Sequence, residues 1–139
     1  MAQAPVLPAT GDPRVRKLEA ARTGAVGQEH SEHDFHERAL SLHAHRLQVL
    51  ASNIANADTP GYKARDVDVA QALREGIRKP ADLALYYVTP SQPSIDGNTV
   101  DLDRERASFA DAALRYQFCL DRVSGHYKHM MELFQNLKG

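Results

Sequence analysis

One stretch of sequence decides the fold: Leu50-Ala-Ser-Asn-Ile-Ala-Asn-Ala-Asp-Thr-Pro-Gly-Tyr-Lys-Ala-Arg-Asp66. We call residues 51–66 the joint. Proline disfavours the helical conformation in the residue before it, and Pro60-Gly61 suits the central positions of a type II turn. Asparagine and aspartate side chains can hydrogen-bond the backbone groups that a helix leaves unpaired at its end. The joint therefore predicts that a helix ends here and that the chain continues in an extended conformation.

The residues before the joint predict the helix that it ends. From Leu40 to Ala57, apolar residues and His43 recur at alternating spacings of three and four, which is the pattern of a coiled coil. Asp34 is the expected N-cap and Pro60 the expected limit. The predicted helix covers residues 34–58. Its seam residues are Leu47, Leu50 and Ile54.

A longer helix is predicted over residues 101–139, with Asp101 or Asp103 as its N-cap. It would be about 55 Å long, whereas the mean helix has about 11–12 residues. We expect it to pair with the first helix as a coiled coil and to need a neighbour for its remaining apolar surface. Its predicted seam residues are Phe109, Tyr116, Leu120, Val123, Tyr127, Met130 and Phe134.

The predicted fold class is mainly α, with elongated N- and C-terminal helices and a small irregular or β middle segment. The middle segment covers residues 59–100. Within it we expect a short helix from Ala70 to Arg78, a strand from Leu83 to Val88, and a loose hairpin return through Thr99 and Val100. Residues 1–33 mix proline, glycine and alanine without a sustained period, and we expect them to be a flexible N-terminal extension.

Composition excludes several classes of protein. The chain has 139 residues, a formal net charge of −1 and no apolar run near the ~20 residues of a membrane helix. Cys119 is the only cysteine, which excludes an internal disulfide and a multi-cysteine zinc site. The N-terminus lacks the pattern of a cleaved signal peptide. We expect no nucleic-acid partner.

The sequence contains no recognisable set of catalytic residues, so we expect no enzyme activity, cofactor or small-molecule substrate. His30, His33 and His36 recur every three residues among carboxylates, which permits a metal site on one helical face. A solvated polar stretch is the preferred interpretation, because a metal site needs a fixed backbone and supporting hydrogen bonds. A small metal-binding protein remains an alternative, as does a helical export adaptor.

The joint resembles the signature of bacterial flagellar rod and hook proteins, and most specifically that of the proximal-rod subunits of the basal body. A second segment, Gln92-Pro-Ser-Ile-Asp-Gly-Asn-Thr-Val-Asp-Leu-Asp-Arg-Glu105, matches the entry of that family into its C-terminal helix. The resemblance covers about residues 35–139. The matching joint residues are Asn53, Asn56, Asp58, Thr59, Pro60, Gly61, Tyr62, Arg65 and Asp66; those of the second motif are Asp96, Gly97, Asn98, Thr99, Val100 and Asp101.

The resemblance implies a structural subunit of the flagellar rod, needed for motility and located in the periplasmic part of the basal body. In that family the terminal helices pack as a coiled coil, subunits stack helically, and export proceeds through the flagellar type III apparatus. The implied partners are other copies of the chain, other rod proteins, the adaptor between rod and membrane ring, and the export gate. Phe35, Ala39 and Leu40 lie in a stretch that resembles the export-gate motif of early rod and hook substrates.

Overall fold

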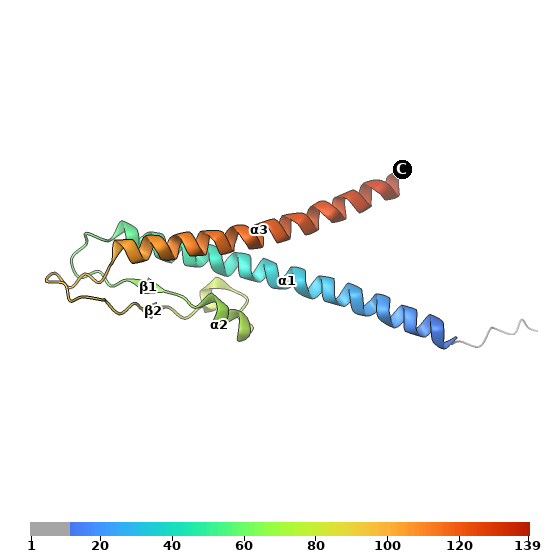
Figure 1. Ribbon diagram of the computed structural model, residues 1–139, viewed down its shortest axis with the longest axis horizontal. Coiled ribbons are helices and arrows are strands. Elements are labelled where there is room, and N and C mark those ends of the chain that lie inside the picture. The colour runs from blue at the N-terminus through green and yellow to red at the C-terminus, as the bar shows by residue number, and fades with distance from the viewer. Residues whose placement is uncertain (1–11) are drawn as a thin grey trace, which may run out of the picture. The chain divides into compact units, whose positions relative to one another are not determined.

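The computed structural model describes residues 12–139, apart from the side chains at positions 26, 29 and 30. The chain divides into two compact units, Met1–Glu32 and His33–Gly139. The predicted mainly helical fold is confirmed: two long helices are connected by a short irregular segment that carries two very short strands (Figure 1). The elements are α1 Pro13–Ala55, β1 Arg65–Asp66, α2 Val69–Arg74, the 3-10 helix η1 Pro80–Asp82, β2 Tyr86–Tyr87 and α3 Leu102–Lys138.

Helix α1 begins at Pro13, about twenty residues before the predicted start at Asp34. Asp12 precedes it: its carbonyl oxygen accepts from the backbone N–H of Val15 at 2.9 Å, and its carboxylate accepts from the N–H of Arg14 at 2.9 Å. Proline at the first helical position after a capping aspartate is a standard helix start. The prediction of a flexible extension over residues 1–33 is therefore wrong for residues 13–33, where Asp12-Pro13 starts the helix and the glycines do not interrupt it. Residues 13–33 are therefore helical, and residues 1–11 lie outside the described part of the chain.

The other end of α1 also differs from the prediction, because the helix ends at Ala55 and not at residue 58. Residues 56–58 form turns, in which the N–H of Ala57 donates to the carbonyl oxygen of Ile54 at 3.3 Å. Pro60 lies beyond these turns and is exposed. It does not itself stop the helix.

The middle segment is built on α2 and a two-stranded sheet. Asp68 caps α2 by accepting from the N–H of Gln71 at 2.9 Å. Strands β1 and β2 pair antiparallel, with Arg65 opposite Tyr87. The predicted strand over residues 83–88 is thus reduced to two residues. The predicted hairpin return through residues 99–100 is absent from the described strands, since this stretch bonds to the joint instead.

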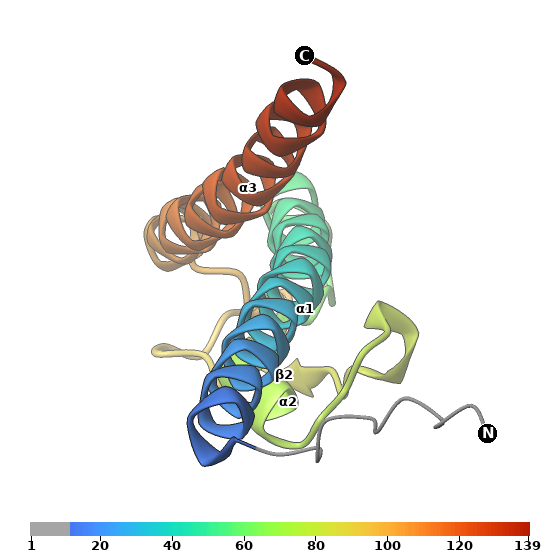
Figure 2. The same cartoon turned by 90° about the vertical axis from the view of Figure 1, so that its right-hand side faces the viewer.

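The core of the second unit lies where the middle segment meets α1. Leu42 on α1 is fully buried and clusters with Val67, Val69 and Ala72. Burying a leucine side chain contributes about 1.5–3 kcal/mol, so this cluster holds the middle segment on the helix. In Figures 1 and 2 the middle segment lies along the C-terminal half of α1, while α3 lies along a different side of α1.

Helices α1 and α3 pair antiparallel, from Asn53 with Glu105 at one end to His33 with His126 at the other. The buried residues of α3 are Glu105, Ala112, Cys119 and Val123. Of the predicted seam residues, Leu50 and Val123 are buried; Leu47, Ile54, Phe109, Tyr116 and Leu120 are half-buried; and Tyr127, Met130 and Phe134 are exposed.

The predicted seam on α3 is therefore wrong in two respects. The buried line runs through Ala112 and Cys119, and no residue of α3 after Val123 is buried. Small residues, Ala112 and Cys119, are buried on α3, and small side chains allow two helices to pack closely. The bulkier Tyr116 and Leu120 lie beside that line and are only half covered. The largest apolar residues do not mark the seam, because close packing of helices depends on how side chains interlock and not on their size alone.

Candidate functional site

Asn53 is the centre of the joint, although it lies on the last two turns of α1. Its side chain is fully buried. The amide Nδ2 donates to the carbonyl oxygen of Arg65 at 2.7 Å and to the carboxylate Oε2 of Glu105 at 2.9 Å. The amide Oδ1 accepts from the N–H of Arg65 at 3.1 Å and from the hydroxyl of Tyr62 at 3.2 Å. One side chain thus connects α1, the start of β1 and α3.

Asn98, from the second motif, holds the turns that follow the C-terminal end of α1. Its Nδ2 lies 3.1, 2.9 and 2.7 Å from the carbonyl oxygens of Asn56, Ala57 and Thr59. These carbonyl groups lie in the turns that follow α1, and those of Asn56 and Thr59 also accept from the backbone N–H groups of Thr59 and Tyr62. Its Oδ1 accepts from the N–H of Val100 at 2.8 Å. A residue about forty positions downstream therefore holds the chain just after α1, at the point where the sequence predicts that Pro60 ends the helix.

Backbone contacts complete the connection between the two motifs. The N–H of Gly61 donates to the carbonyl oxygen of Asp96 at 2.9 Å, and the N–H of Thr99 donates to that of Tyr62 at 3.0 Å. Gly61 and Gly97 both have φ of +74°, and a Cβ on Gly97 would lie 3.7 Å from the Cα of Gly61. Glycine is the residue that adopts this conformation without strain.

The remaining motif residues lie around this network. Asn56 donates from Nδ2 to the carbonyl oxygen of Ser52 at 2.8 Å, and Thr59 donates to Asn56 Oδ1 at 3.2 Å. Asp101 caps α3 by accepting from the N–H of Asp103 at 3.1 Å. Asp58 is exposed, as Pro60 is. The two motifs predicted from sequence as separate segments thus form one contiguous site.

Two charged residues of the site, Arg46 and Glu105, are not among the residues predicted from the sequence. Arg46 forms a two-pronged pair with Asp66, from Nε to Oδ1 at 2.8 Å and from Nη2 to Oδ2 at 2.9 Å. Its Nη1 also lies 3.5 Å from Asp111 on α3. Arg46 stands three residues after His43 and four before Leu50, so its position on the buried face was readable from the helical period. The arginine fork matches a carboxylate in a fixed geometry, so this pair orients β1 against α1.

Glu105 is the second missed residue, and it is only 2% exposed. Burial raises the pKa of Glu105, and the hydrogen bond from Asn53 acts in the opposite direction. A buried carboxylate is costly without partners. Its place at the start of α3 made it look like an ordinary acidic residue in a first helical turn, and no local signal showed its burial.

The histidine cluster does not form a metal site among the residues whose side chains are described. His33 Nε2 lies 3.1 Å from Glu37 Oε1, and the His33 ring stacks on His126 with centroids 4.0 Å apart. His36 packs edge-on against Phe118. The side chain of His30 lies outside the described residues. These histidines are packing residues between α1 and α3.

The three residues of the export-gate-like stretch differ in exposure. Phe35 is exposed, Leu40 is half-buried and Ala39 is only 2% exposed. They lie on one turn and a half of α1 and do not contact the joint network.

The arrangement holds two helices and a middle segment in fixed relation, and its polar groups are occupied by one another. Asn53, Asn98 and the Arg46–Asp66 pair satisfy backbone ends and charges of the same chain. Neither long helix, within the described residues, offers a stretch long and apolar enough to span a bilayer. The fold and the site define a structural protein made of paired helices, whose polar centre serves architecture.

Comparison with known proteins agrees with this class. The sequence profile of the family described as "Flagella basal body rod protein" matches residues 34–63. The flagellar basal body rod protein FlgB of Escherichia coli K12 is 44% identical over 126 residues, which covers 73% of this chain and 91% of that protein. The proteins of the same name from Yersinia enterocolitica and Salmonella typhimurium are each 42% identical, with the same coverage.

This chain belongs to the FlgB family of flagellar basal body rod proteins. It is a structural subunit of the rod in the basal body and assembles with other rod components. The assignment based on the joint and the second motif is thereby confirmed, and the metal-binding alternative finds no support.

Proposed function

We propose that this chain builds the proximal part of the rod, at the end nearest the membrane ring and the export gate, and that copies of it stack helically. The single observation that carries the proposal is the closure of both motifs into one network through Asn53 and Asn98. This network fixes the direction in which the middle segment leaves the helix pair. A helical assembly needs that direction to be identical in every copy, because each copy repeats the same contacts.

The proposed partners follow from the location. They are other copies of the chain, other rod proteins, the adaptor that joins rod and ring, and the export gate. The joint residues that reach the surface, Asp58, Thr59 and Pro60, are exposed and available for contacts between subunits.

Export by the flagellar type III apparatus is the second part of the proposal. Ala39 is buried in the folded chain, so a gate that reads Phe35, Ala39 and Leu40 together must read them before folding. Leu40→Asp is expected to lower the amount of chain that reaches the periplasm. Gln48→Asp is the matched control, because Gln48 is an exposed residue of the same helix. Equal export of the two variants would contradict the assignment of this motif.

Deletion of the gene tests the proposed function directly. The deleted strain should lack flagella and motility while its membrane ring remains in place, and the wild-type chain supplied from a plasmid should restore both. Electron microscopy of isolated basal bodies distinguishes a missing rod from a missing ring. Normal rods in the deleted strain would refute the proposal.

A further inference from the structure

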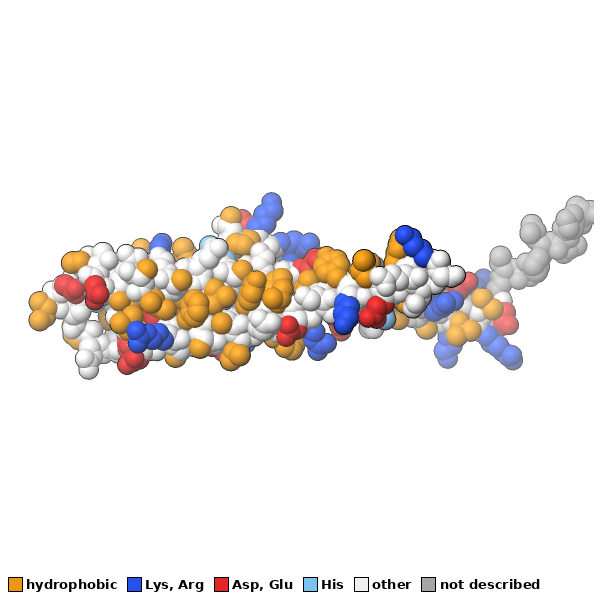
Figure 3. Space-filling view, turned by 90° about the horizontal axis from the view of Figure 1, so that it is seen from above, with side chains coloured by type: hydrophobic (Ala, Val, Ile, Leu, Met, Phe, Trp, Pro, Cys, Tyr) orange, Lys and Arg blue, Asp and Glu red, His pale blue; other side chains and the backbone are white. Residues whose placement is uncertain are grey.

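Three histidines of α1 lie along its contact with α3, and we call His33, His36 and His43 the histidine row. Their spacing of i, i+3 and i+10 places them on one face of a helix. His33 stacks on His126 with ring centroids 4.0 Å apart, and His36 packs edge-on against Phe118 at 6.0 Å. On the face seen in Figure 3, histidine side chains show only as small patches. The histidine row is therefore part of the packed contact between the two helices.

One nitrogen of each ring in the histidine row has no partner. The Nδ1 atoms of His33, His36 and His43 are buried, and none of them hydrogen-bonds to a residue that the structure describes. A neutral histidine carries hydrogen on one ring nitrogen only, whereas the charged form carries it on both. A proton taken up by the row therefore creates a buried N–H that nothing accepts, and an unpaired buried donor is costly. The packed contact favours uncharged histidines.

A single carboxylate faces the stacked pair of His33 and His126. His33 Nε2 lies 3.1 Å from Oε1 of Glu37, and that oxygen also accepts from the hydroxyl of Tyr127 at 2.8 Å. Glu37 can offset one positive charge on His33. No carboxylate of the described residues forms an ion pair with His126. Two charged rings at 4.0 Å would therefore repel each other and push α1 and α3 apart.

A cation already lies near His36. The guanidinium carbon of Arg122 is 5.4 Å from the centroid of the Phe118 ring, and His36 packs against the same ring. A charged His36 would be the second cation on that ring. Like charges brought close together repel, so this contact too is weakened when its histidine is charged.

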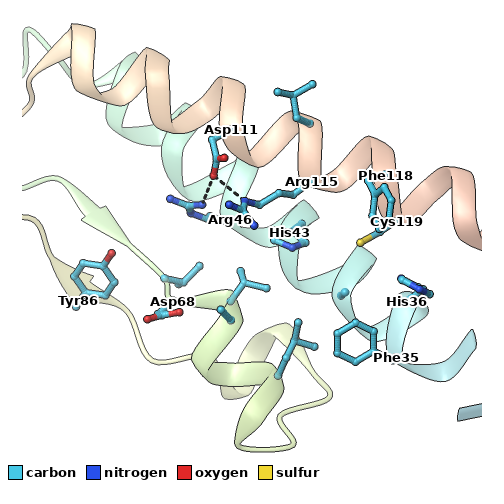
Figure 4. A pocket seen from close by; sticks show the side chains of 16 residues that line it. Phe35, His36, His43, Arg46, Asp68, Tyr86, Asp111, Arg115, Phe118 and Cys119 are labelled. Atoms are coloured by element: carbon cyan, nitrogen blue, oxygen red, sulfur yellow. Dashed lines mark hydrogen bonds and ion pairs between the residues drawn. The ribbon is translucent and has the colours of Figure 1, made fainter. Parts of the chain in front are cut away.

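His43 lies near two arginines. Burial lowers the pKa of His43, and Arg115 and Arg46 lower it further, against the opposite effect of Asp111. Asp111 is already shared between the two arginines, 2.9 Å from Arg115 and 3.5 Å from Arg46. Figure 4 shows His43 next to Arg46 and Arg115, with Asp111 bonded to both. A charge on the buried His43 would meet little solvent and a carboxylate that is already engaged.

Three more titratable groups line the cavity beside His36 and His43: Asp68 of the middle segment, Tyr86 of β2 and Cys119 of α3. Asp68 is exposed and already accepts from the N–H group that it caps. Burial raises the pKa of the Tyr86 hydroxyl and of the Cys119 thiol, so both are neutral in the pH range where histidines titrate. The response of this contact to acid is therefore set by the histidines.

The joint end of the same helix pair responds to acid in the opposite sense. Glu105 on α3 is 2% exposed, and its Oε2 accepts from Asn53 on α1 at 2.9 Å. Burial raises the pKa of Glu105, so acid removes a charge from the protein interior at this end. Acid thus adds charges at one end of the helix pair and removes one at the other.

We propose that acid separates α1 from α3 at the histidine row while the joint keeps the other end of the helix pair closed. A histidine in water takes up a proton near pH 6.5. The contact is therefore fully stable above that pH, and its stability is lost as the pH falls below it. Charging of clustered histidines is a general way to switch a packed contact. The inference goes beyond the proposed rod function and does not depend on it.

Hydrogen exchange of the full purified chain, followed by mass spectrometry, tests this opening. Rates are measured at pH 7.5 and 5.5 and corrected for the intrinsic pH dependence of exchange. A helix end without its partner is marginally stable in water, so its amides lose protection. Protection of residues 33–47 and 112–127 should fall at least about tenfold, the change that one histidine gives over one pH unit below 6.5. Protection of residues 50–55 and 102–108, at the joint, should change less than about threefold.

A triple variant removes the titrating groups of the row: His33→Gln, His36→Phe and His43→Leu. Glutamine keeps a donor for Glu37, and the two apolar side chains keep packing without a buried nitrogen. Protection of the same segments should then agree at the two pH values within about threefold. His129→Gln is the matched control, because His129 is an exposed histidine of α3, and it should show the full loss seen in the wild-type chain.

Three results would overturn the inference: constant protection of the wild-type chain, an equal loss at both ends of the helix pair, or a triple variant that keeps the wild-type loss. If circular dichroism shows that the triple variant is not helical at pH 7.5, His33→Gln alone is measured. It should reduce the loss at residues 112–127, and an unchanged loss would overturn the inference as well. All these measurements use the purified chain, so their failure is distinct from a failure of the rod function, which the deletion strain tests.

Discussion

Replacing Asn53 by alanine provides the sharpest test of the joint. The side chain is fully buried and takes part in four hydrogen bonds, to the backbone of Arg65 on both its N–H and carbonyl sides, to Tyr62 and to Glu105. Alanine removes all four without changing the backbone conformation that a helix requires. The partners stay in place and lose their bonds inside the protein.

The expected cost follows from what is left unpaired. Each hydrogen bond contributes about 0.5–1.5 kcal/mol net, and one to a charged group about 1.5–3 kcal/mol. Leaving the buried Glu105 carboxylate and the Arg65 backbone without a partner places Asn53→Ala at about 3–5 kcal/mol of lost unfolding free energy at neutral pH. This is a large part of the roughly 5–15 kcal/mol by which folded domains are stable.

Urea unfolding followed by circular dichroism measures this loss. Asn56→Ala is the matched control, because Asn56 belongs to the same motif but its side chain bonds only to Ser52 and Thr59, close to it in the sequence. Its cost should stay below about 1 kcal/mol, as for surface hydrogen bonds. Equal losses for the two variants would refute the central role given to Asn53.

The pH dependence adds a second, independent criterion. Burial raises the pKa of Glu105, and Asn53 opposes this by stabilising the charged form. A raised pKa in the folded state means that the protonated carboxyl contributes stability below the unfolded pKa, and that this contribution is lost as pH rises through the folded pKa. Asn53→Ala raises the folded pKa further, so its cost should grow from acid to neutral pH. A cost that is independent of pH would show that Glu105 is not coupled to Asn53.

Three further predictions concern the helix end, a buried histidine and the seam. Asn98→Ala should lose about 2–3 kcal/mol of unfolding free energy because the turns after α1 lose the side chain that holds them, whereas Pro60→Ala, at an exposed position, should stay within about 1 kcal/mol in the same urea titration. Burial lowers the pKa of His43, and Arg115 and Arg46 lower it further, so the free energy of unfolding should fall as the pH drops through the pKa of the folded protein. The urea midpoint of His43→Leu should therefore depend less on pH between 7.5 and 5.5 than that of the wild-type chain. Leu50→Asp should prevent folding and rod assembly, because it buries a charge. Leu120 is half-buried, so Leu120→Asp should destabilise the chain less but still abolish motility on soft agar. Normal motility of Leu120→Asp would show that Leu120 does not belong to a helix–helix contact of the assembled rod.

The sequence predicted the elements that repeat and the motifs that a family shares. Both long helices followed from apolar spacing, since the period of a helix is visible in any window of a dozen residues. The capping residue of α2, Asp68, and the start of α3 at Asp101 agree with local capping chemistry. The start of α1 was equally readable, because Asp12-Pro13 is a local signal that received too little weight.

The pairing of distant residues could not be read from spacing. Nothing near Asn98 shows that its amide reaches the carbonyl groups of residues 56–59, and nothing near Glu105 shows that Asn53 covers it. The centre of the seam on α3 was missed for a related reason. Ala112 carries little hydrophobicity of its own, and only the proximity of α1 makes it a contact residue.

The joint also affects the order in which parts of the chain can fold. The bonds that Asn98 and Glu105 make to the joint connect residues separated by 39 to 52 positions, such as Thr59 with Asn98 and Asn53 with Glu105. Contacts between distant residues form late, because the intervening chain must be ordered first. When the chain emerges with its N-terminus first, from a ribosome or from a narrow conduit, α1 emerges long before Asn98 and Glu105, the residues that hold its C-terminal end in place. The bonds of the joint can form only after more than two thirds of the chain has emerged, so the subunit completes its fold near the end of its synthesis or export.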